Sequence, residues 1–273
     1  MKVQVLGVGL LGPGLDNWAQ GAAALHQGYT AAPTVVPAPQ RLPATERRRA
    51  GSVVKASIVV ADQAVAAAGV QAALLPTVFT SSSGDPLNCH LLCEALAQAQ
   101  RLVSPTRFTN SVHNVAAGYW HIALQSRAPS TSLAAYDASF AAGLLEAAVQ
   151  CLAAQAPVLL VACDVPYPEP LHALRPLADV FAVALVLSPA AETGAAAGGA
   201  AQLELHSSTA ALLGPATPCA DPALEALRQG NPAARALPLL LALLQAAPAR
   251  LVLQGVPGHA LAVDVRPSSP PRP

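Results

Sequence analysis

The chain has 273 residues, of which 53% are hydrophobic and only 11% are charged, with 15 basic and 15 acidic side chains. Its length suits one α/β domain with a well-buried core, or two small domains. A surface so poor in charge excludes electrostatic binding of nucleic acid or anionic lipid, and its apolar area favours an oligomer.

The first half of the chain alternates between short apolar runs and helical patterns. The run at 3–6 predicts a buried strand that ends in a glycine turn, and Asp16 is placed to cap a short helix after it. A loop rich in proline and threonine follows at 28–44. We expect further strands at 77–81, 130–135 and 158–164, and helices at 86–101, 116–126 and 138–155.

A helix also opens at Glu46, directly before Arg47, Arg48 and Arg49. Its apolar residues recur at helical spacing and give it one apolar face. The arginine run marks a solvated helix start, or else a contact with the acidic surface of a partner.

The second half is expected to continue with a proline-rich loop at 166–176 and more strands. The expected elements are strands at 181–187 and 202–207 joined by a loop or hairpin tip at 190–201, a linker at 208–222, a helix at 232–246, an antiparallel pair at 250–254 and 260–265, and a frayed tail at 266–273. The strand–helix alternation predicts an α/β fold with a largely parallel centre.

Neither a signal peptide nor a membrane span is expected. Glycines interrupt the apolar run that follows Lys2, and the apolar stretch at 239–244 is far shorter than a bilayer requires. The five cysteines lack the spacing of a disulfide framework, so we expect reduced thiols and a cytoplasmic protein.

Two motifs suggest a ligand but are incomplete. Gly7, Gly9 and Gly12 match the dinucleotide fingerprint, yet proline follows them and no acid stands where the ribose would need one. Cys89 and Cys93 share one face of a helix, but a structural zinc needs four ligands and no second pair occurs. We therefore expect neither a cofactor nor a metal.

Ser139 follows Asp137 at a strand-to-helix turn, a place where a nucleophile can be displayed. His113 and His172 are its candidate bases. A serine hydrolase is therefore one alternative, although the chain has no G-x-S-x-G motif.

The stretch TSLAAYDASFAAGLLEAA at 131–148 resembles the nucleophile segment of β-ketoacyl-acyl-carrier-protein synthases. Other stretches resemble segments of the same family in the same order, over about residues 1–208. They are VQVLGVGLLGPGLDNW, TVFTSSSGDP, SPTRFTNSVHNVAAGYWHIAL, APVLLVACDVPYPE and FAVALVLSPAAETGAAAGGAAQLELHSS. The resemblance implies an α/β fold of the thiolase type.

Two departures imply that condensing activity is absent. The position of the family's nucleophilic cysteine corresponds to Asp137, and a carboxylate cannot form the thioester that condensation needs. We expect Asp137 to act as an N-cap of the following helix instead. The two catalytic histidines of the family also have no counterpart, because His259 does not stand in their sequence context.

The chain is most similar to the short chain-length-factor subunits of type II polyketide systems, including those that make aryl polyenes. This resemblance implies a heterodimer with an active ketosynthase whose acyl tunnel the chain helps to shape; contact with an acyl-carrier protein stays open. It implies pocket or interface positions at His113, Asn114, Tyr136, Ser139 and Phe140. For pairing across the dimer interface we predict the strand residues Val158, Leu159, Leu160 and Val161.

In domain terms, we expect a ketosynthase-like N-terminal half at 1–208 and a reduced C-terminal remnant, a helix plus a β-hairpin, at 209–273. Two alternatives to an accessory subunit stay open. One is a truncated enzyme that uses Asp137, His113 or Ser139 for decarboxylation or acyl transfer. The other is a nucleotide-binding protein that uses the glycine turn.

Overall fold

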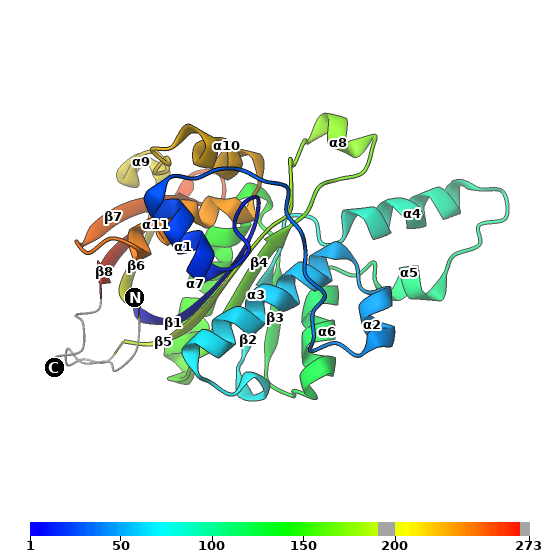
Figure 1. Ribbon diagram of the computed structural model, residues 1–273, viewed down its shortest axis with the longest axis horizontal. Coiled ribbons are helices and arrows are strands. Elements are labelled where there is room, and N and C mark those ends of the chain that lie inside the picture. The colour runs from blue at the N-terminus through cyan, green and yellow to red at the C-terminus, as the bar shows by residue number, and fades with distance from the viewer. Residues whose placement is uncertain (191–199, 268–273) are drawn as a thin grey trace.

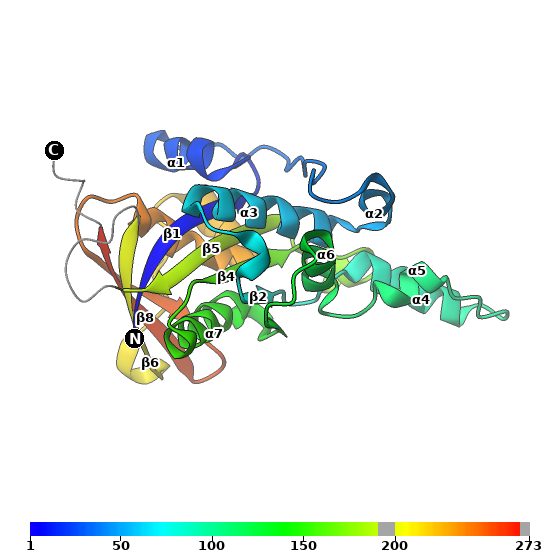
Figure 2. The same cartoon turned by 90° about the horizontal axis from the view of Figure 1, so that it is seen from below.

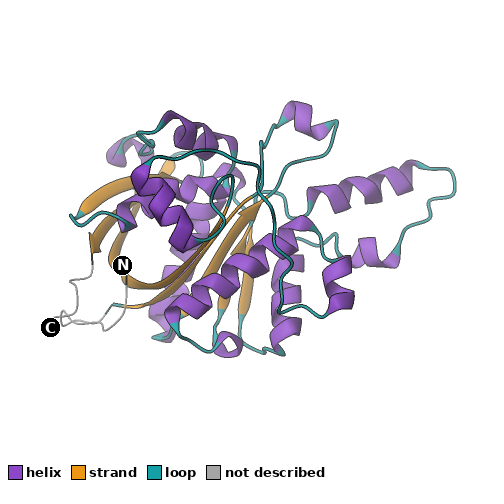
Figure 3. Cartoon of the chain, in the orientation of Figure 1, coloured by secondary structure: helices purple, strands orange, loops and turns teal. Residues whose placement is uncertain are grey.

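The computed structural model describes residues 1–190 and 200–267, which form one mixed sheet with helices on both sides (Figures 1 and 3). The strand order across the sheet is β3-β2-β4-β5-β1-β6-β8-β7. The expected α/β architecture is therefore confirmed. Most of the loop expected at 190–201 and most of the tail expected at 266–273 lie outside the described residues.

The strands lie close to the expected positions. Their bounds are β1 (Lys2–Leu11), β2 (Thr77–Thr80), β3 (Ser130–Leu133), β4 (Val158–Asp164), β5 (Phe181–Pro189), β6 (Ala201–Thr209), β7 (Ala249–Gln254) and β8 (His259–Pro267). The antiparallel pair expected near the C-terminus is confirmed as β7 and β8, and β8 also pairs with β6. The C-terminal strands thus extend the same sheet.

The helices include several that the sequence did not reveal. Their bounds are α1 (Trp18–Gln27), α2 (Ala44–Arg49), α3 (Ser52–Ala68), η1 (Ala72–Leu74), α4 (Pro86–Ala97), α5 (Pro105–Thr109), α6 (Val115–Leu124), η2 (Tyr136–Ala138), α7 (Ser139–Ala154), α8 (Leu171–Leu174), α9 (Ala210–Leu213), α10 (Pro222–Gly230), η3 (Ala233–Ala236) and α11 (Leu237–Leu243). The cap of α1 is Asn17, not Asp16: its side chain accepts from Gln20 N (2.9 Å).

The expectation of a largely parallel centre is wrong beyond β4. Strands β3, β2 and β4 run parallel, whereas β5 is antiparallel to both β4 and β1. A parallel pair needs a crossover connection, usually a helix of some length. The connection at 165–180 carries only the short helix α8, which suits an antiparallel return.

The centre of the sheet is buried on both faces, as Figure 2 shows with α3 on one side and α7 on the other. Along β4, Leu160 belongs to the core under α7, and its neighbours Leu159 and Val161 belong to the core under α3. A strand that is covered on both faces has no polar side, which explains the uninterrupted apolar run of β4.

This burial overturns the predicted dimer contact. Val158, Leu159, Leu160 and Val161 are each 0% exposed, and β4 is hydrogen-bonded to β2 on one side and β5 on the other. Neither its edge nor its side chains can reach a second subunit, so the prediction that these residues pair across an interface is wrong. The edge strand nearest to β4 is β3, which lies on the far side of β2.

The glycines of the apparent dinucleotide fingerprint lie inside or next to β1 instead of in a phosphate-binding turn. A Cβ atom on Gly7 would lie 2.2 Å from the carbonyl oxygen of Ala64, and one on Gly9 would lie 2.0 Å from that of Val60. Both glycines therefore let α3 pack directly on the strand. The glycine-turn expectation and the nucleotide-binding alternative are not supported by this arrangement.

We predict that Gly9→Ala lowers the free energy of unfolding by at least about 2 kcal/mol, because the added methyl group would collide with the backbone of α3. Gly118→Ala is the matched control, since a Cβ there meets nothing within 4 Å and alanine favours the interior of α6. Urea unfolding of both variants checks this. Equal stability of Gly9→Ala and wild type would contradict the packing argument.

Candidate functional site

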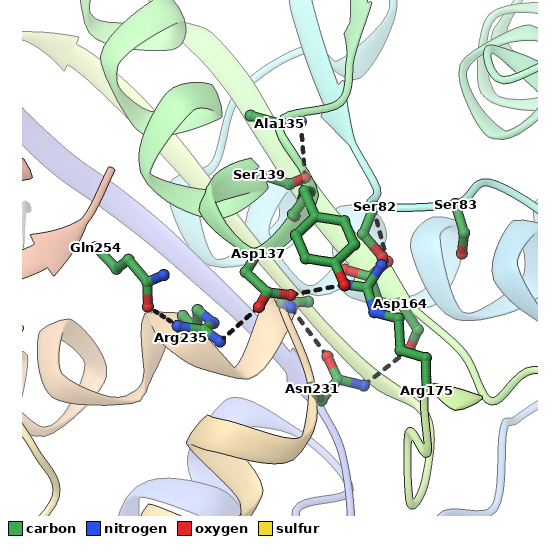
Figure 4. A network of polar contacts seen from close by, with 12 residues as sticks. Ser82, Ser83, Ala135, Asp137, Ser139, Asp164, Arg175, Asn231, Arg235 and Gln254 are labelled. Atoms are coloured by element: carbon green, nitrogen blue, oxygen red, sulfur yellow. Dashed lines mark hydrogen bonds and ion pairs between the residues drawn. The ribbon is translucent and has the colours of Figure 1, made fainter. Parts of the chain in front are cut away.

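Three polar segments meet at the carboxyl ends of the parallel strands (Figure 4). They are Ser81 and Ser82 after β2, the turn at 135–138 after β3, and Asp164 at the end of β4. In open α/β sheets, ligands bind outside the carboxyl ends of the strands, which makes this the candidate functional site.

The turn after β3 is held in an unusual backbone conformation. Tyr136 has a φ of 52°, a left-handed conformation that a bulky residue adopts only when its surroundings hold it there. Ser139 supplies part of that support, because its hydroxyl donates to Tyr136 O (2.7 Å) and accepts from Ala135 N (3.0 Å). Phe140, in the next position, is buried in the core under α7.

Asp137 points from this turn into a pair of arginines. Its Oδ1 accepts a hydrogen bond from Arg175 Nη2 (2.7 Å) and its Oδ2 accepts one from Arg235 Nη2 (3.0 Å). Arg235 in turn contacts Gln254, and burial lowers the pKa of Arg235 although Asp137 opposes the shift. The side chain of Asp137 makes no capping bond to α7, so the expected N-cap role is wrong.

Asp164 is a second carboxylate at the site, and it is buried. Its Oδ1 accepts from Ser81 Oγ (3.1 Å), Ser82 N (2.7 Å) and Ser82 Oγ (2.7 Å). Burial raises the pKa of Asp164 to about 6, while these hydrogen bonds and the charge of Arg175 act in the opposite direction. Asn231 closes the network, because its Nδ2 donates to the carbonyl oxygen of Asp164 (3.2 Å).

The remaining predicted residues are only partly brought together. His113 reaches the site, where its Nε2 lies 3.0 Å from the carbonyl oxygen of Ser81. Asn114 instead lines a groove of about 630 Å³ beside α6. No hydrogen bond in the described part of the chain joins Ser139 to His113 or His172, which removes the geometric basis for a serine hydrolase.

The cysteine pair forms no metal centre in the described part of the chain. Cys89 and Cys93 are exposed on α4, and the described residues contain no group of three His, Cys, Asp or Glu side chains placed to hold a metal ion. Desolvation, followed by the neighbouring Cys93, raises the pKa of the Cys89 thiol, which disfavours the thiolate that a metal binds.

One helical stretch, Tyr136–Ala154, is long and apolar enough to cross a membrane by length and composition alone. It consists of η2 and α7. About half of it is buried within the fold, and α7 packs on the central strands. We interpret it as a core helix.

Sequence reasoning missed Arg175, Arg235, Asp164 and Asn231. Both arginines stand alone in apolar segments of a chain with few charges. An isolated charge in such a segment needs a partner, and that is the one signal that could have marked them.

A family model described as beta-ketoacyl synthase, N-terminal domain, matches residues 16–236. This confirms the resemblance, although the match runs past the boundary expected at 208. The assignment of 209–273 to a C-terminal remnant stays a prediction. No curated protein sequence matches the chain.

Solved structures agree with this fold. A chain of the ketosynthase (ApeO) in complex with its chain length factor (ApeC) from Xenorhabdus doucetiae aligns with a TM-score of 0.71 at 22% identity, covering 97% of this chain and 99% of that chain. The ishigamide ketosynthase/chain length factor aligns with a TM-score of 0.70 at 12% identity, covering 98% and 99%.

A further match is a type II polyketide synthase acyl-carrier protein in complex with its ketosynthase bound to the hexaketide, with a TM-score of 0.75 at 13% identity, covering 97% of this chain and 99% of that chain. Likeness at these identities shows the fold, and the thiolase-type expectation is confirmed.

We predict that Asp164→Asn removes a pH dependence of stability. Because the folded-state pKa of Asp164 is raised from 3.8 to about 6, the folded protein binds this proton more tightly than the unfolded chain does. The free energy of unfolding should therefore fall by about 3 kcal/mol from this group as pH rises through that window.

Urea unfolding at several pH values measures the effect, with Asp16→Asn as a control at an exposed position. The control should keep the wild-type slope. If Asp164→Asn also keeps it, the raised pKa of Asp164 is contradicted.

Proposed function

The chain belongs to the beta-ketoacyl synthase family, and we propose that it is a non-catalytic subunit of that family that pairs with an active ketosynthase. In this proposal it acts as a chain length factor in cytoplasmic fatty-acid or polyketide biosynthesis of the aryl polyene type. Two of the similar structures are described as ketosynthases with chain length factors.

The state of Asp137 carries the proposal. At the turn that resembles the family's nucleophile segment, the residue is a carboxylate whose two oxygens are both bonded to guanidinium groups. Both oxygens are thus occupied by cationic donors, so the side chain is poorly placed to accept a substrate proton or to attack an acyl group. None of the five cysteines lies in the turn.

The alternative of a truncated enzyme loses support for the same reason. Ser139 and His113 are each engaged by backbone groups and not by one another. The set Asp137, His113 and Ser139 therefore lacks the nucleophile–base contact that acyl transfer requires.

The open edge of β3 is where we propose that the partner joins. Within the described residues β3 pairs only with β2. Thr77 N donates to Pro129 O and Ser81 N donates to Leu133 O. Every second residue from Pro129 to Leu133 therefore turns its backbone hydrogen-bonding groups toward β2. The backbones of Ser130 and Ser132 then face away from β2 and are free to pair with another strand.

An exposed apolar arm near this edge supports the same face. Helices α4 and α5 project beyond the body in both views (Figures 1 and 2), and in α4 only Pro86 is buried. Large apolar side chains on the arm are open to solvent: Leu87, Leu96, Leu102 and Phe108. Large apolar side chains left exposed on one projecting arm favour a contact with another protein.

Only accessible residues can line the proposed acyl tunnel. His113, Asn114 and Tyr136 are exposed, whereas Ser139 and Phe140 are each 1% exposed and belong to the core. The expected lining role of those two is thus replaced by a structural one. An acyl-carrier protein is a second partner that we propose, since one similar structure contains one with its ketosynthase.

We predict that Ser132→Pro abolishes pairing with the ketosynthase or raises its Kd at least about ten-fold, because proline removes an outward N–H while the bonds to β2 persist. Ser132→Thr, which keeps the N–H, is the control. Each variant is co-expressed with a ketosynthase, and complex mass and Kd are measured.

A wild-type chain that stays alone beside every ketosynthase offered would contradict the proposed function. A Ser132→Pro chain that pairs as well as wild type would contradict the β3 interface alone.

A further inference from the structure

The connection at 166–176, which contains α8, is attached to the fold mainly at its ends. None of its side chains is buried, and Leu174 is 84% exposed. The flanking residues Val165 and Leu177 are buried. In Figure 1, α8 lies at the tip of a loop that stands away from the sheet. The segment therefore adds little to the core, and something else must hold it in place.

Arg175 provides that attachment. Among the described residues, its hydrogen bond to Asp137 Oδ1 (2.7 Å) is the one hydrogen bond or ion pair between 166–176 and the rest of the protein. The segment's other hydrogen bonds are internal, such as that from Arg175 to Tyr167 Oη (3.3 Å). The Arg175 guanidinium also lies 3.7 Å from the centroid of the Tyr136 ring, a cation–π contact.

We propose that residues 166–176 form a lid over the turn at Tyr136 and Asp137, and that the Arg175–Asp137 ion pair is its latch. Four prolines, Pro166, Pro168, Pro170 and Pro176, limit bending inside the segment. Helix α8 is a single turn, too short to be stable alone, so its internal hydrogen bonds open when the lid detaches. Opening uncovers the face of the Tyr136 ring on which Arg175 lies, and frees Oδ1 of Asp137.

The two oxygens of Asp137 bind different parts of the protein. Oδ1 holds the lid through Arg175, and Oδ2 holds the body of the protein through Arg235 (3.0 Å). The turn thus stays built when the latch is released. The side chains of Arg175 and Asp137 are 22% and 30% exposed, so solvent reaches the ion pair and high salt weakens it.

Hydrogen–deuterium exchange on the millisecond scale, measured on the whole chain without a partner, tests the latch. Arg175→Gln should speed exchange of the lid amides by about ten-fold. These amides include the backbone N–H groups at positions 172 and 175. Arg235→Gln is the matched variant, because it removes the other arginine of Asp137 and should leave lid exchange within about two-fold of wild type.

Raising salt to about 1 M should speed lid exchange in wild type and leave Arg175→Gln unchanged. A cooperative thermal transition verifies that each variant is folded. Unchanged lid exchange in Arg175→Gln, or an equal increase in Arg235→Gln, would overturn the latch. Because no partner is present, neither result bears on the proposed pairing with a ketosynthase.

Discussion

The ion pairs of Asp137 connect three parts of the chain that are far apart in the sequence. They join the turn before α7 to Arg175, 38 residues on, and to Arg235, 98 residues on. With Asp137 removed, two partly buried guanidinium groups would face one space without a counter-charge, which is costly. The shape of the candidate site therefore depends on this one carboxylate.

Local patterns were enough to predict most of the sheet. The continuous apolar run of β4 and the turn before β8 are features of neighbouring residues, and both strands lie where they were expected. The glycines of β1 were misjudged because a strand and a turn can carry the same motif. Gly7 and Gly9 lie two residues apart, on one face of a strand, and that spacing indicates close helix packing.

The site itself could be predicted only in part. The turn at Asp137 follows from the strand-to-helix transition and from the family resemblance. Its partners do not, because sequence alone cannot show which of the chain's arginines folds back onto it. The same holds for Asp164: its position at the end of β4 is local information, whereas its burial against Ser81 and Ser82 depends on tertiary packing. The interface prediction failed because β4 is central in the sheet, and strand order is not written in local sequence.

The family fold and the proposed non-catalytic role are compatible. A helix N-terminus that follows a tight turn is suited to display a nucleophile, and here the same architecture displays an ion pair. The proposed accessory role would use the surface around this turn: the edge of β3, the apolar arm of α4 and α5, and the lid above Tyr136.

Intact-mass analysis of the purified complex, after incubation with an acyl donor and an acyl-trapping inhibitor such as cerulenin, tests the central claim most directly. If this chain is non-catalytic, the ketosynthase gains a covalent adduct and this chain keeps its unmodified mass. An adduct on this chain, formed at the rate of acyl transfer, would show that it carries a nucleophile and would contradict a non-catalytic role.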